Sequence, residues 1–425
     1  MLFFLGSSLG VALMVVGVPI FVVFTLSGAI ILFFDLQVTW FTMGQAVFAS
    51  VTKYILVAIP LFIFAGHLML SGGIARRLID LFVAFFGHFR GGLAIAAILS
   101  VAVFSAISGS ILASIITIGT IMIPEMVRQG YSRAFSGALI AAVAGIDALI
   151  PPSNAAIVYC SITGNSVSDV FMAGMIPGLV QASLLSVVVI VLCRKMKRSA
   201  PAPWRERGRT IYRAFPALSL PIIILGGIYT GIFLPTEAAA VAGVCCLFIG
   251  FVVYRELTLS RVWKALVATA QSTCIIFILI ATASFLSQVM IYTRIPQQIS
   301  EAIIGSGFSP VTFMLLASVV MLILGTFMEA VPCTLIAMPL FMVIGKNLGV
   351  DLVHFYVPFT IFIGIGLVTP PLAVGAYTAA SIAEESPDNI FRNLYPWMVL
   401  ALVVSGVINI FVPQLATWLP RMMHS

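Results

Sequence analysis

Long apolar runs limit this chain to the lipid bilayer. They cover residues 2–16, 18–34, 44–70, 92–127, 133–163, 170–193, 214–234, 237–255, 262–292, 311–346, 353–383 and 395–418. About 20 consecutive apolar residues are enough for a helix to cross a membrane. Only 8% of the 425 residues are charged, whereas soluble domains carry about 25%. The sequence therefore predicts one all-α, polytopic membrane protein and excludes a water-soluble enzyme.

The distribution of basic residues predicts the orientation in the membrane. Eight of the 21 Lys and Arg residues lie within 194–213. Short loops rich in Lys and Arg remain on the cytoplasmic side, beside anionic lipid. With 194–213 as a cytoplasmic loop, 17 basic residues fall inside and only Arg294, Lys346 and Arg421 fall outside. The net charge of +7 is therefore attributed to topology and not to binding of nucleic acid.

Two of the runs are too long for one crossing and have polar or glycine-containing centres. The run 92–127 contains Ser108-Gly109-Ser110, and the run 311–346 contains Gly325-Thr326 and Glu329. Each is predicted to be a re-entrant hairpin, which enters the membrane and leaves it on the same side. The hairpin at 92–127 is assigned to the inner side and the hairpin at 311–346 to the outer side.

Two other runs contain adjacent prolines. Pro151-Pro152 interrupts 133–163, and Pro370-Pro371 interrupts 353–383. A double proline removes two N–H donors and cannot lie inside a continuous helix. Each run is therefore predicted to be a broken helix, with two halves joined by unwound backbone that is buried in protein or lines a cavity.

The chain repeats at an offset of 219 residues. This offset aligns five Gly and Pro residues: Gly130 with Gly349, Gly145 with Gly364, Pro151 with Pro370, Pro152 with Pro371, and Pro177 with Pro396. The repeat unit contains an odd number of crossings, so the second copy must be inverted. The predicted organisation is a first repeat over 1–193, the basic loop 194–213 and a second repeat over 214–425. Inverted repeats with broken helices are typical of secondary transporters.

Unwound segments inside a membrane offer binding groups. Free carbonyls and helix C-terminal ends suit Na⁺, and helix N-terminal ends suit a carboxylate. In the first copy the candidates are Ser105, Ser108, Gly109, Ser110, Gly145 and the run from Asp147 to Asn154. In the second copy they are Gly325, Thr326, Met328, Glu329, Gly364, Gly366, Thr369 and Pro370. An isolated Ser or Thr can instead bond to its own helix, so each hydroxyl also has a purely structural interpretation.

Three charged residues are singled out. Asp147 and Glu329 are carboxylates within apolar runs, where an ionisable group is costly and marks function by default; a protonated or capped structural role is the alternative. Arg294 precedes the outer hairpin, and its guanidinium suits a carboxylate ligand; anchoring to lipid headgroups is the alternative. No catalytic residues are predicted, because the four histidines form no H-E-x-x-H motif and the sequence contains no P-loop motif.

The motifs around the breaks resemble one transporter family. The strings ISGSILASIITIGTIMIPEM, ALIPPSNAAIVY, FMAGMIPG and LVTPPLAVGAY are similar to those of the large membrane subunit of tripartite ATP-independent periplasmic (TRAP) transporters. The resemblance implies an elevator-type permease in a bacterial inner membrane that imports an organic acid with Na⁺ as coupling ion and has no other cofactor. It also implies two partners, a small four-helix membrane subunit and a periplasmic solute-binding protein.

The resemblance also implies site residues. One Na⁺ site would involve Ser108, Ser110, Gly145 and Pro152. A second would involve Thr326, Met328, Gly364 and Thr369. For the substrate, the resemblance applies only to Arg294, which resembles a carboxylate-contacting residue of the sialic-acid branch. With the residues at the breaks, the predicted substrate-binding set is Arg294, Ser153, Asn154, Glu329 and Asp147.

The resulting prediction is a Na⁺-coupled TRAP permease for a carboxylated solute such as sialic acid or a C4-dicarboxylate. One alternative is a stand-alone Na⁺/dicarboxylate symporter of related architecture. A second alternative is an intramembrane enzyme or a non-transporting scaffold, which would not require a symmetric pair of unwound sites.

Overall fold

The computed structural model describes residues 13, 17–35, 40–196 and 201–423, and within these ranges the regular structure is entirely helical. The first part of the chain forms α2 (Ile20–Asp35), α3 (Trp40–Val51), η1 (Tyr54–Val57), α4 (Ala58–Ser71), α5 (Ile74–Phe86), α6 (Gly92–Ser108), α7 (Ile111–Arg128), α8 (Arg133–Ala144), η2 (Gly145–Ala148), α9 (Asn154–Thr163) and α10 (Val167–Leu192). The first apolar run, 2–16, lies almost entirely outside the described residues.

The second part begins in the basic stretch. It forms α11 (Trp204–Tyr229), α12 (Pro235–Phe248), η3 (Ile249–Val253), α13 (Leu259–Tyr292), α14 (Ile295–Gly305), α15 (Pro310–Phe327), α16 (Ala330–Asn347), α17 (Leu352–Gly366), α18 (Val374–Ala383), α19 (Pro387–Leu394), α20 (Trp397–Phe411) and α21 (Gln414–Met423). Among the described residues, eight helices are long and apolar enough to cross a membrane, or up to nine if the bent pair α19–α20 forms one span. The predicted all-α polytopic membrane protein is confirmed.

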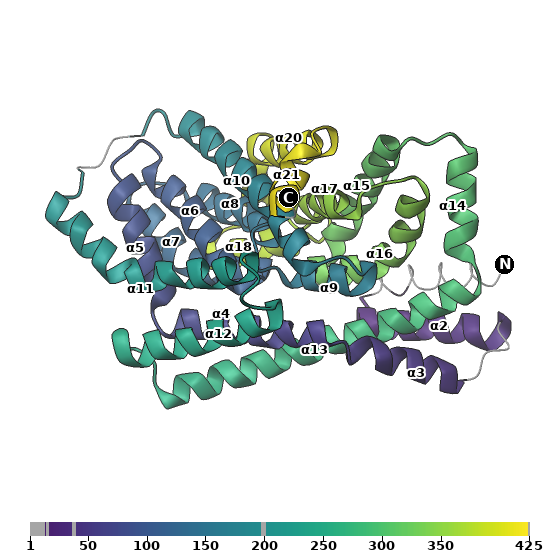
Figure 1. Ribbon diagram of the computed structural model, residues 1–425. Coiled ribbons are helices and arrows are strands. Elements are labelled where there is room, and N and C mark those ends of the chain that lie inside the picture. The colour runs from purple at the N-terminus through teal and green to yellow at the C-terminus, as the bar shows by residue number, and fades with distance from the viewer. Residues whose placement is uncertain (1–12, 14–16, 36–39, 197–200, 424–425) are drawn as a thin grey trace.

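One layer of the molecule is built around α13. This 34-residue helix contacts α2, α3 and α4, and α4 also contacts α12. Figure 1 shows these helices lying together below the rest of the molecule. The other helices, including α6 to α10 and α15 to α18, form a second group above them. The layer supports this group along one side, because α13 contacts α16 and α4 contacts α6.

Helix ends repeat at the offset found in the sequence. Helices α7 and α16 have 18 residues each, and both their first and their last residues are 219 positions apart. The same offset relates the starts of α3 and α13, the starts of α8 and α17, and the ends of α10 and α20. The two copies therefore share a common pattern of helices over most of their length.

The structure adds detail to two segments. The apolar run 44–70 is divided, since α3 ends at Val51 and η1 begins at Tyr54. Between them Lys53 is extended, and its amine donates a hydrogen bond to the Ser161 carbonyl. The stretch 194–213 is not a loop throughout, because α11 begins at Trp204. Arg is a good helix former, and Glu206 in the first turn favours a helix N-terminus.

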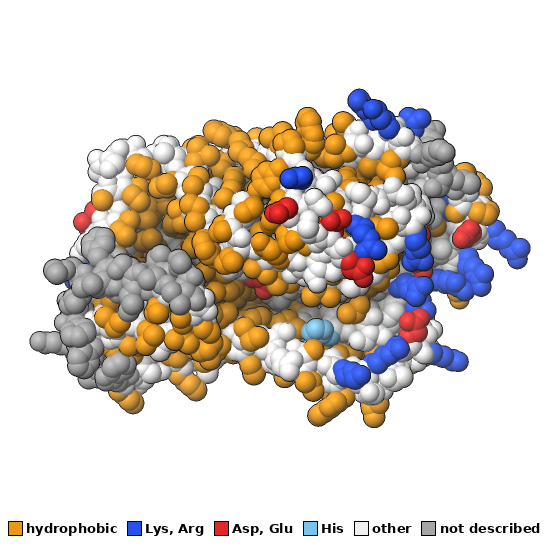
Figure 2. All heavy atoms as spheres, turned by 180° about the vertical axis from the view of Figure 1, so that it is seen from behind, with side chains coloured by type: hydrophobic (Ala, Val, Ile, Leu, Met, Phe, Trp, Pro, Cys, Tyr) orange, Lys and Arg blue, Asp and Glu red, His pale blue; other side chains and the backbone are white. Residues whose placement is uncertain are grey.

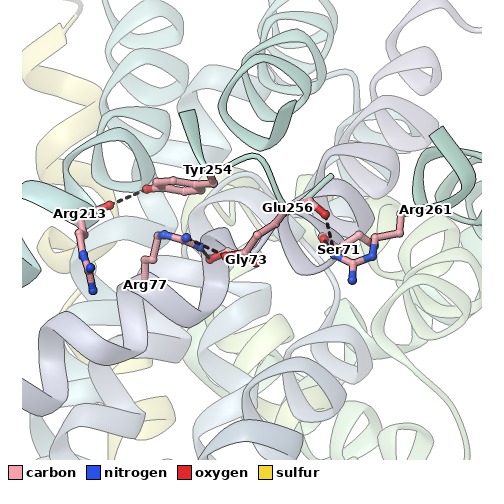
Figure 3. A network of polar contacts seen from close by, with 7 residues as sticks. All are labelled: Ser71, Gly73, Arg77, Arg213, Tyr254, Glu256 and Arg261. Carbon is pink, nitrogen blue, oxygen red and sulfur yellow. Dashed lines mark hydrogen bonds and ion pairs between the residues drawn. The ribbon is translucent and has the colours of Figure 1, made fainter. Parts of the chain in front are cut away.

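A polar junction joins the turn after α4 to the turn before α13 (Figure 3). Arg77 Nη2 lies 2.7 Å from Glu256 Oε1, and its guanidinium lies 3.8 Å from the centre of the Tyr254 ring. Arg261 donates to the Glu256 and Ser71 carbonyls, while the Tyr254 hydroxyl donates to a carbonyl of α11. These contacts hold α5 and α11 against the α13 layer.

Charge is also unevenly placed in three dimensions. Figure 2 shows Lys and Arg side chains gathered toward the end of the molecule that holds α5 and α11, with hydrophobic side chains over much of the remaining face. This distribution agrees with the separation of basic residues expected for a protein that spans a membrane.

Candidate functional site

The tip between α6 and α7 lies against the first proline break. Gly109 ends α6 with a φ of +62°, in the left-handed region that favours glycine. The Asn154 N–H donates to the Gly109 carbonyl over 3.3 Å. A Cβ added to Gly109 would lie only 2.8 Å from the Pro152 oxygen. The tip and the break therefore fit together only because residue 109 has no side chain.

Asp147 lies in the short helix η2 and contacts this tip. Its Oδ1 accepts hydrogen bonds from Ser108 Oγ over 3.1 Å and from Ser114 Oγ over 2.8 Å. Its Oδ2 is buried and has no hydrogen-bond partner. The Asn154 Oδ1 is also buried without a partner. Two buried oxygen atoms therefore remain unsatisfied where a bound ligand would supply a contact.

The second copy has the corresponding tip-to-break contact. The Ala373 N–H donates to the Thr326 carbonyl over 3.1 Å. Close packing of α15 on α17 places Gly325 so near that an added Cβ would lie 2.5 Å from the Ile363 oxygen. The breaks differ in exposure, because Pro151 and Pro152 are buried whereas Pro370 and Pro371 are exposed.

The two copies meet at equivalent glycines. A Cβ added to Gly364 would lie 3.4 Å from the Gly145 Cα, and a Cβ added to Gly145 would lie 3.9 Å from the Gly364 Cα. These are the residues that the 219-residue offset aligns. Both are buried where the first half of each broken helix ends. The ends of the first halves of the two broken helices are therefore neighbours in the interior.

A cavity of about 560 Å³ lies between the tips. It is bounded by both hairpin tips, by the start of α9 and by α4 and α13 of the supporting layer. Its lining is mainly apolar, with polar groups from His67, Ser110, Asn154, Ser272 and Glu329 among others. The size and the few convergent polar groups are typical of a site for a small molecule.

The structure brings most of the predicted site residues together, but not all of them. Those that line the cavity are Ser108, Ser110, Ser153, Asn154, Met328 and Glu329. Those buried beside it are Gly145, Asp147, Pro152, Thr326 and Gly364. Thr369 is half-buried, and its hydroxyl accepts a hydrogen bond from Tyr395. Arg294 is exposed where α13 meets α14 and does not line the cavity.

Sequence reasoning did not single out several residues of the site. Ser114 contacts Asp147, and the Tyr356 hydroxyl donates to the Ala148 carbonyl over 2.6 Å. Gln181 is buried, with its Nε2 beside Gly145 and its Oε1 unpartnered. An amide in the apolar helix α10 is a signal that could have marked Gln181 in the sequence. His67 and Ser272 line the cavity from the supporting layer.

Comparison with known proteins identifies the family. The family model described as "Tripartite ATP-independent periplasmic transporter, DctM component" matches residues 9–415. The C4-dicarboxylate TRAP transporter large permease protein DctM of Pseudomonas aeruginosa is 38% identical over 376 residues, which cover 88% of each chain. The ectoine/5-hydroxyectoine TRAP transporter large permease protein UehC of Ruegeria pomeroyi is 35% identical and covers 92% of each chain.

A solved structure shares the fold. The YdaH transporter of Alcanivorax borkumensis matches 98% of each chain with a TM-score of 0.66 and 13% identity. That identity supports a common fold and nothing more. The match to the family model over nearly the whole chain carries the assignment, and it removes the intramembrane enzyme and the scaffold from consideration. The chain belongs to the DctM family, the large permease component of TRAP transporters.

Proposed function

We propose that this permease couples inward movement of Na⁺ to import of a small carboxylated solute, such as sialic acid or a C4-dicarboxylate. The observation that carries the proposal is the cavity between the two hairpin tips, with unpartnered buried oxygens beside it. The sequence contains no ATP-binding P-loop. An ion gradient is therefore the proposed energy source, and the membrane potential supplies about 2.3 kcal/mol per charge per 100 mV.

The first Na⁺ site is assigned to Ser108, Ser110, Gly145 and Pro152. Na⁺ prefers oxygen ligands, and this region offers hydroxyls and unwound carbonyls in a buried setting. The second site is assigned to Thr326, Met328, Gly364 and Thr369. Leu372 and Ala373 take the places of Ser153 and Asn154 there, so main-chain carbonyls would dominate the second site.

The solute is assigned to the cavity, with Ser153, Asn154 and Glu329 as its polar contacts. Each of these side chains lines the cavity. Arg294 lies outside the cavity, so binding of a solute carboxylate by Arg294 would require a conformation in which the cavity reaches the start of α14. Normal uptake by an Arg294→Ala variant would favour the role of a lipid anchor.

The transport mechanism is assigned to an elevator built from two inverted repeats. The shared helix ends at an offset of 219 residues support the duplication. Two hairpins and two broken helices, grouped against a layer built on α13, provide a mobile unit and a fixed support. An odd number of crossings per copy would place the two hairpin openings on opposite sides of the membrane.

Two partners complete the proposed system, a small four-helix membrane subunit and a periplasmic solute-binding protein. The family name itself describes a tripartite, periplasmic system. One relative, the isethionate TRAP transporter permease protein DctMQ of Oleidesulfovibrio alaskensis, is 35% identical to this chain, which covers only 59% of that protein. We assign the inner membrane of a bacterium as the location of the complex.

Uptake into proteoliposomes tests the proposal. Vesicles that contain both membrane subunits should accumulate the solute only with Na⁺ outside and with the binding protein present. Replacing Ser108 or Thr326 by Ala should weaken the Na⁺ dependence while leaving expression intact. Full uptake without Na⁺ would refute the coupling. Full uptake without the binding protein would favour the stand-alone symporter.

A further inference from the structure

We infer that the carboxylate of Asp147 is a direct ligand of the cation in the first site and supplies its negative charge. This inference rests on the proposed function, because it concerns the Na⁺ site next to the first proline break. It changes the sequence-based assignment, in which Asp147 was a substrate-binding residue. Four observations on the described residues support it.

The first observation is an unbalanced charge. Asp147 is fully buried, and none of the ion pairs found among the described residues includes it. Its partners Ser108 and Ser114 are neutral hydroxyls, which donate hydrogen bonds but bring no positive charge. A buried ionised carboxylate without a counter-charge is strongly unfavourable. A bound cation would remove this cost.

The second observation is that the two carboxylate oxygens of Asp147 have different surroundings. Both hydroxyls donate to Oδ1, which fixes the orientation of the carboxylate. Oδ2 receives no hydrogen bond although it is buried. Ser105, whose hydroxyl donates to the Val101 carbonyl, is a further neutral neighbour of this carboxylate. Oδ1 is therefore held by two hydroxyls, while Oδ2 has no hydrogen-bond donor of its own.

The third observation is the neighbouring amide. The Asn154 Oδ1 is buried and unpartnered, while its Nδ2 lies beside Gly109. Asn154 thus contacts the tip at Gly109, and Asp147 contacts it at Ser108. The atoms left unsatisfied around the tip are oxygens, which suit a hard cation.

The fourth observation is that Asp147 does not line the cavity, although Ser108 and Ala148 do. A solute in the cavity would meet the tip and the start of α9 before it reached this carboxylate. Glu329 is different, because it does line the cavity. The two acidic groups therefore have separate roles, with Asp147 on the ion and Glu329 on the solute side.

Direct Na⁺ binding to the purified permease complex tests the assignment without any transport. Thermal unfolding is followed while NaCl replaces choline chloride at constant ionic strength. Because a ligand of the native state raises its stability by mass action, the wild-type Tm should rise with Na⁺ and not with K⁺. Asp147→Asn keeps the size of the side chain and removes the charge. It should raise the Na⁺ concentration that gives half of the full increase in Tm (the Na⁺ midpoint) about tenfold or more.

Two further variants keep the test decisive. Glu301→Gln is the matched control, because it neutralises an exposed carboxylate of α14 that does not line the cavity, and its Na⁺ midpoint should stay within about threefold of wild type. Ser114→Ala removes one hydroxyl that orients Oδ1 and should raise the midpoint by a smaller factor than Asp147→Asn. If Asp147→Asn does not fold, Ser114→Ala alone decides the question.

The outcomes separate this inference from the proposed function. An unchanged Na⁺ midpoint in Asp147→Asn or, failing that, in Ser114→Ala would overturn the role of Asp147 while leaving Na⁺ coupling intact. An equal loss in Glu301→Gln would also overturn it, because the effect would then reflect total charge. No Na⁺ response in the wild type, with normal uptake in sodium-free buffer, would refute the proposed coupling itself.

Discussion

At the scale of single residues, the tip of the first hairpin depends on a glycine. Gly109 combines a φ of +62° with the close approach of the Pro152 oxygen. Gly164, which ends α9, has a φ of +77° but would place a Cβ in open space. A comparison of Gly109 with Gly164 therefore separates two effects of adding a side chain. One is the free-energy cost of a left-handed conformation, and the other is the loss of contact between tip and break.

Gly109→Ala should therefore be more damaging than Gly164→Ala. Each substitution costs about 1 kcal/mol for the left-handed conformation, but only residue 109 would also push the tip away from Pro152. We expect a clearly lower Tm and a loss of solute uptake for Gly109→Ala, and a small change in Tm with normal uptake for Gly164→Ala. Equal effects of both substitutions on uptake would show that the tip does not need to contact the break.

At the scale of helices, small residues decide how closely α15 and α17 approach. A Cβ on Gly366 would lie 2.4 Å from the Leu322 oxygen, and a Cβ on Gly325 would lie 2.5 Å from the Ile363 oxygen. Both clashes are with main-chain atoms, which cannot move aside as a flexible side chain can. Membrane helices commonly use small residues for such contacts.

Gly366→Ala should lower the Tm strongly, since α15 and α17 would have to separate. Gly226→Ala in α11 is the control, because its Cβ would meet nothing within 4 Å. Alanine is the better helix former by up to about 1 kcal/mol, so Gly226→Ala should be neutral or slightly stabilising. Similar Tm values for the two variants would contradict the close packing of α15 on α17.

The polar junction between Arg77 and Glu256 (Figure 3) gives a second prediction at the scale of helices. Glu256→Gln removes the charge that faces Arg77, and we expect a loss of up to about 1 kcal/mol, since partly exposed ion pairs contribute little more. Glu125→Gln is the control, because Glu125 pairs with Arg128 within a single exposed helical segment. Unfolding in increasing denaturant should show a lower midpoint for Glu256→Gln only. A larger loss for Glu125→Gln would be inconsistent with a structural role of the junction.

At the scale of the whole molecule, charge and repetition together predict an orientation in the membrane. Basic side chains gather at the end that holds α5 and α11 (Figure 2). The equivalent glycines Gly145 and Gly364 meet in the interior, as expected if a two-fold axis passes between the copies. The proposed inverted arrangement makes a direct prediction about which residues face each side of the membrane.

Cysteine labelling measures this orientation. In a variant without the six native cysteines, Arg294→Cys should react with a membrane-impermeant maleimide in intact cells. Arg205→Cys should react only after the membrane is permeabilised, because the basic stretch is predicted to be cytoplasmic. Both positions are exposed, so unequal access reflects the membrane and not burial. Labelling of both from outside would contradict the topology.

The amino-acid sequence by itself determined the membrane class, the helix breaks and the repeat. These features are local: apolar runs select the bilayer, and adjacent prolines or a glycine between serines interrupt a helix wherever they occur. The predicted ends of both hairpins accordingly lie within one residue of the observed helix ends. The basic stretch was the local exception, since its charge obscured its tendency to form a helix.

Only the tertiary structure decided which of the broken segments meet. The pairing of Ser114 with Asp147, the contact of Gln181 with Gly145 and the exposure of Pro370 depend on packing between helices far apart in the sequence. The same packing leaves Arg294 outside the cavity. A residue's own sequence neighbourhood cannot specify these contacts, because they arise where several helix surfaces fit together at once.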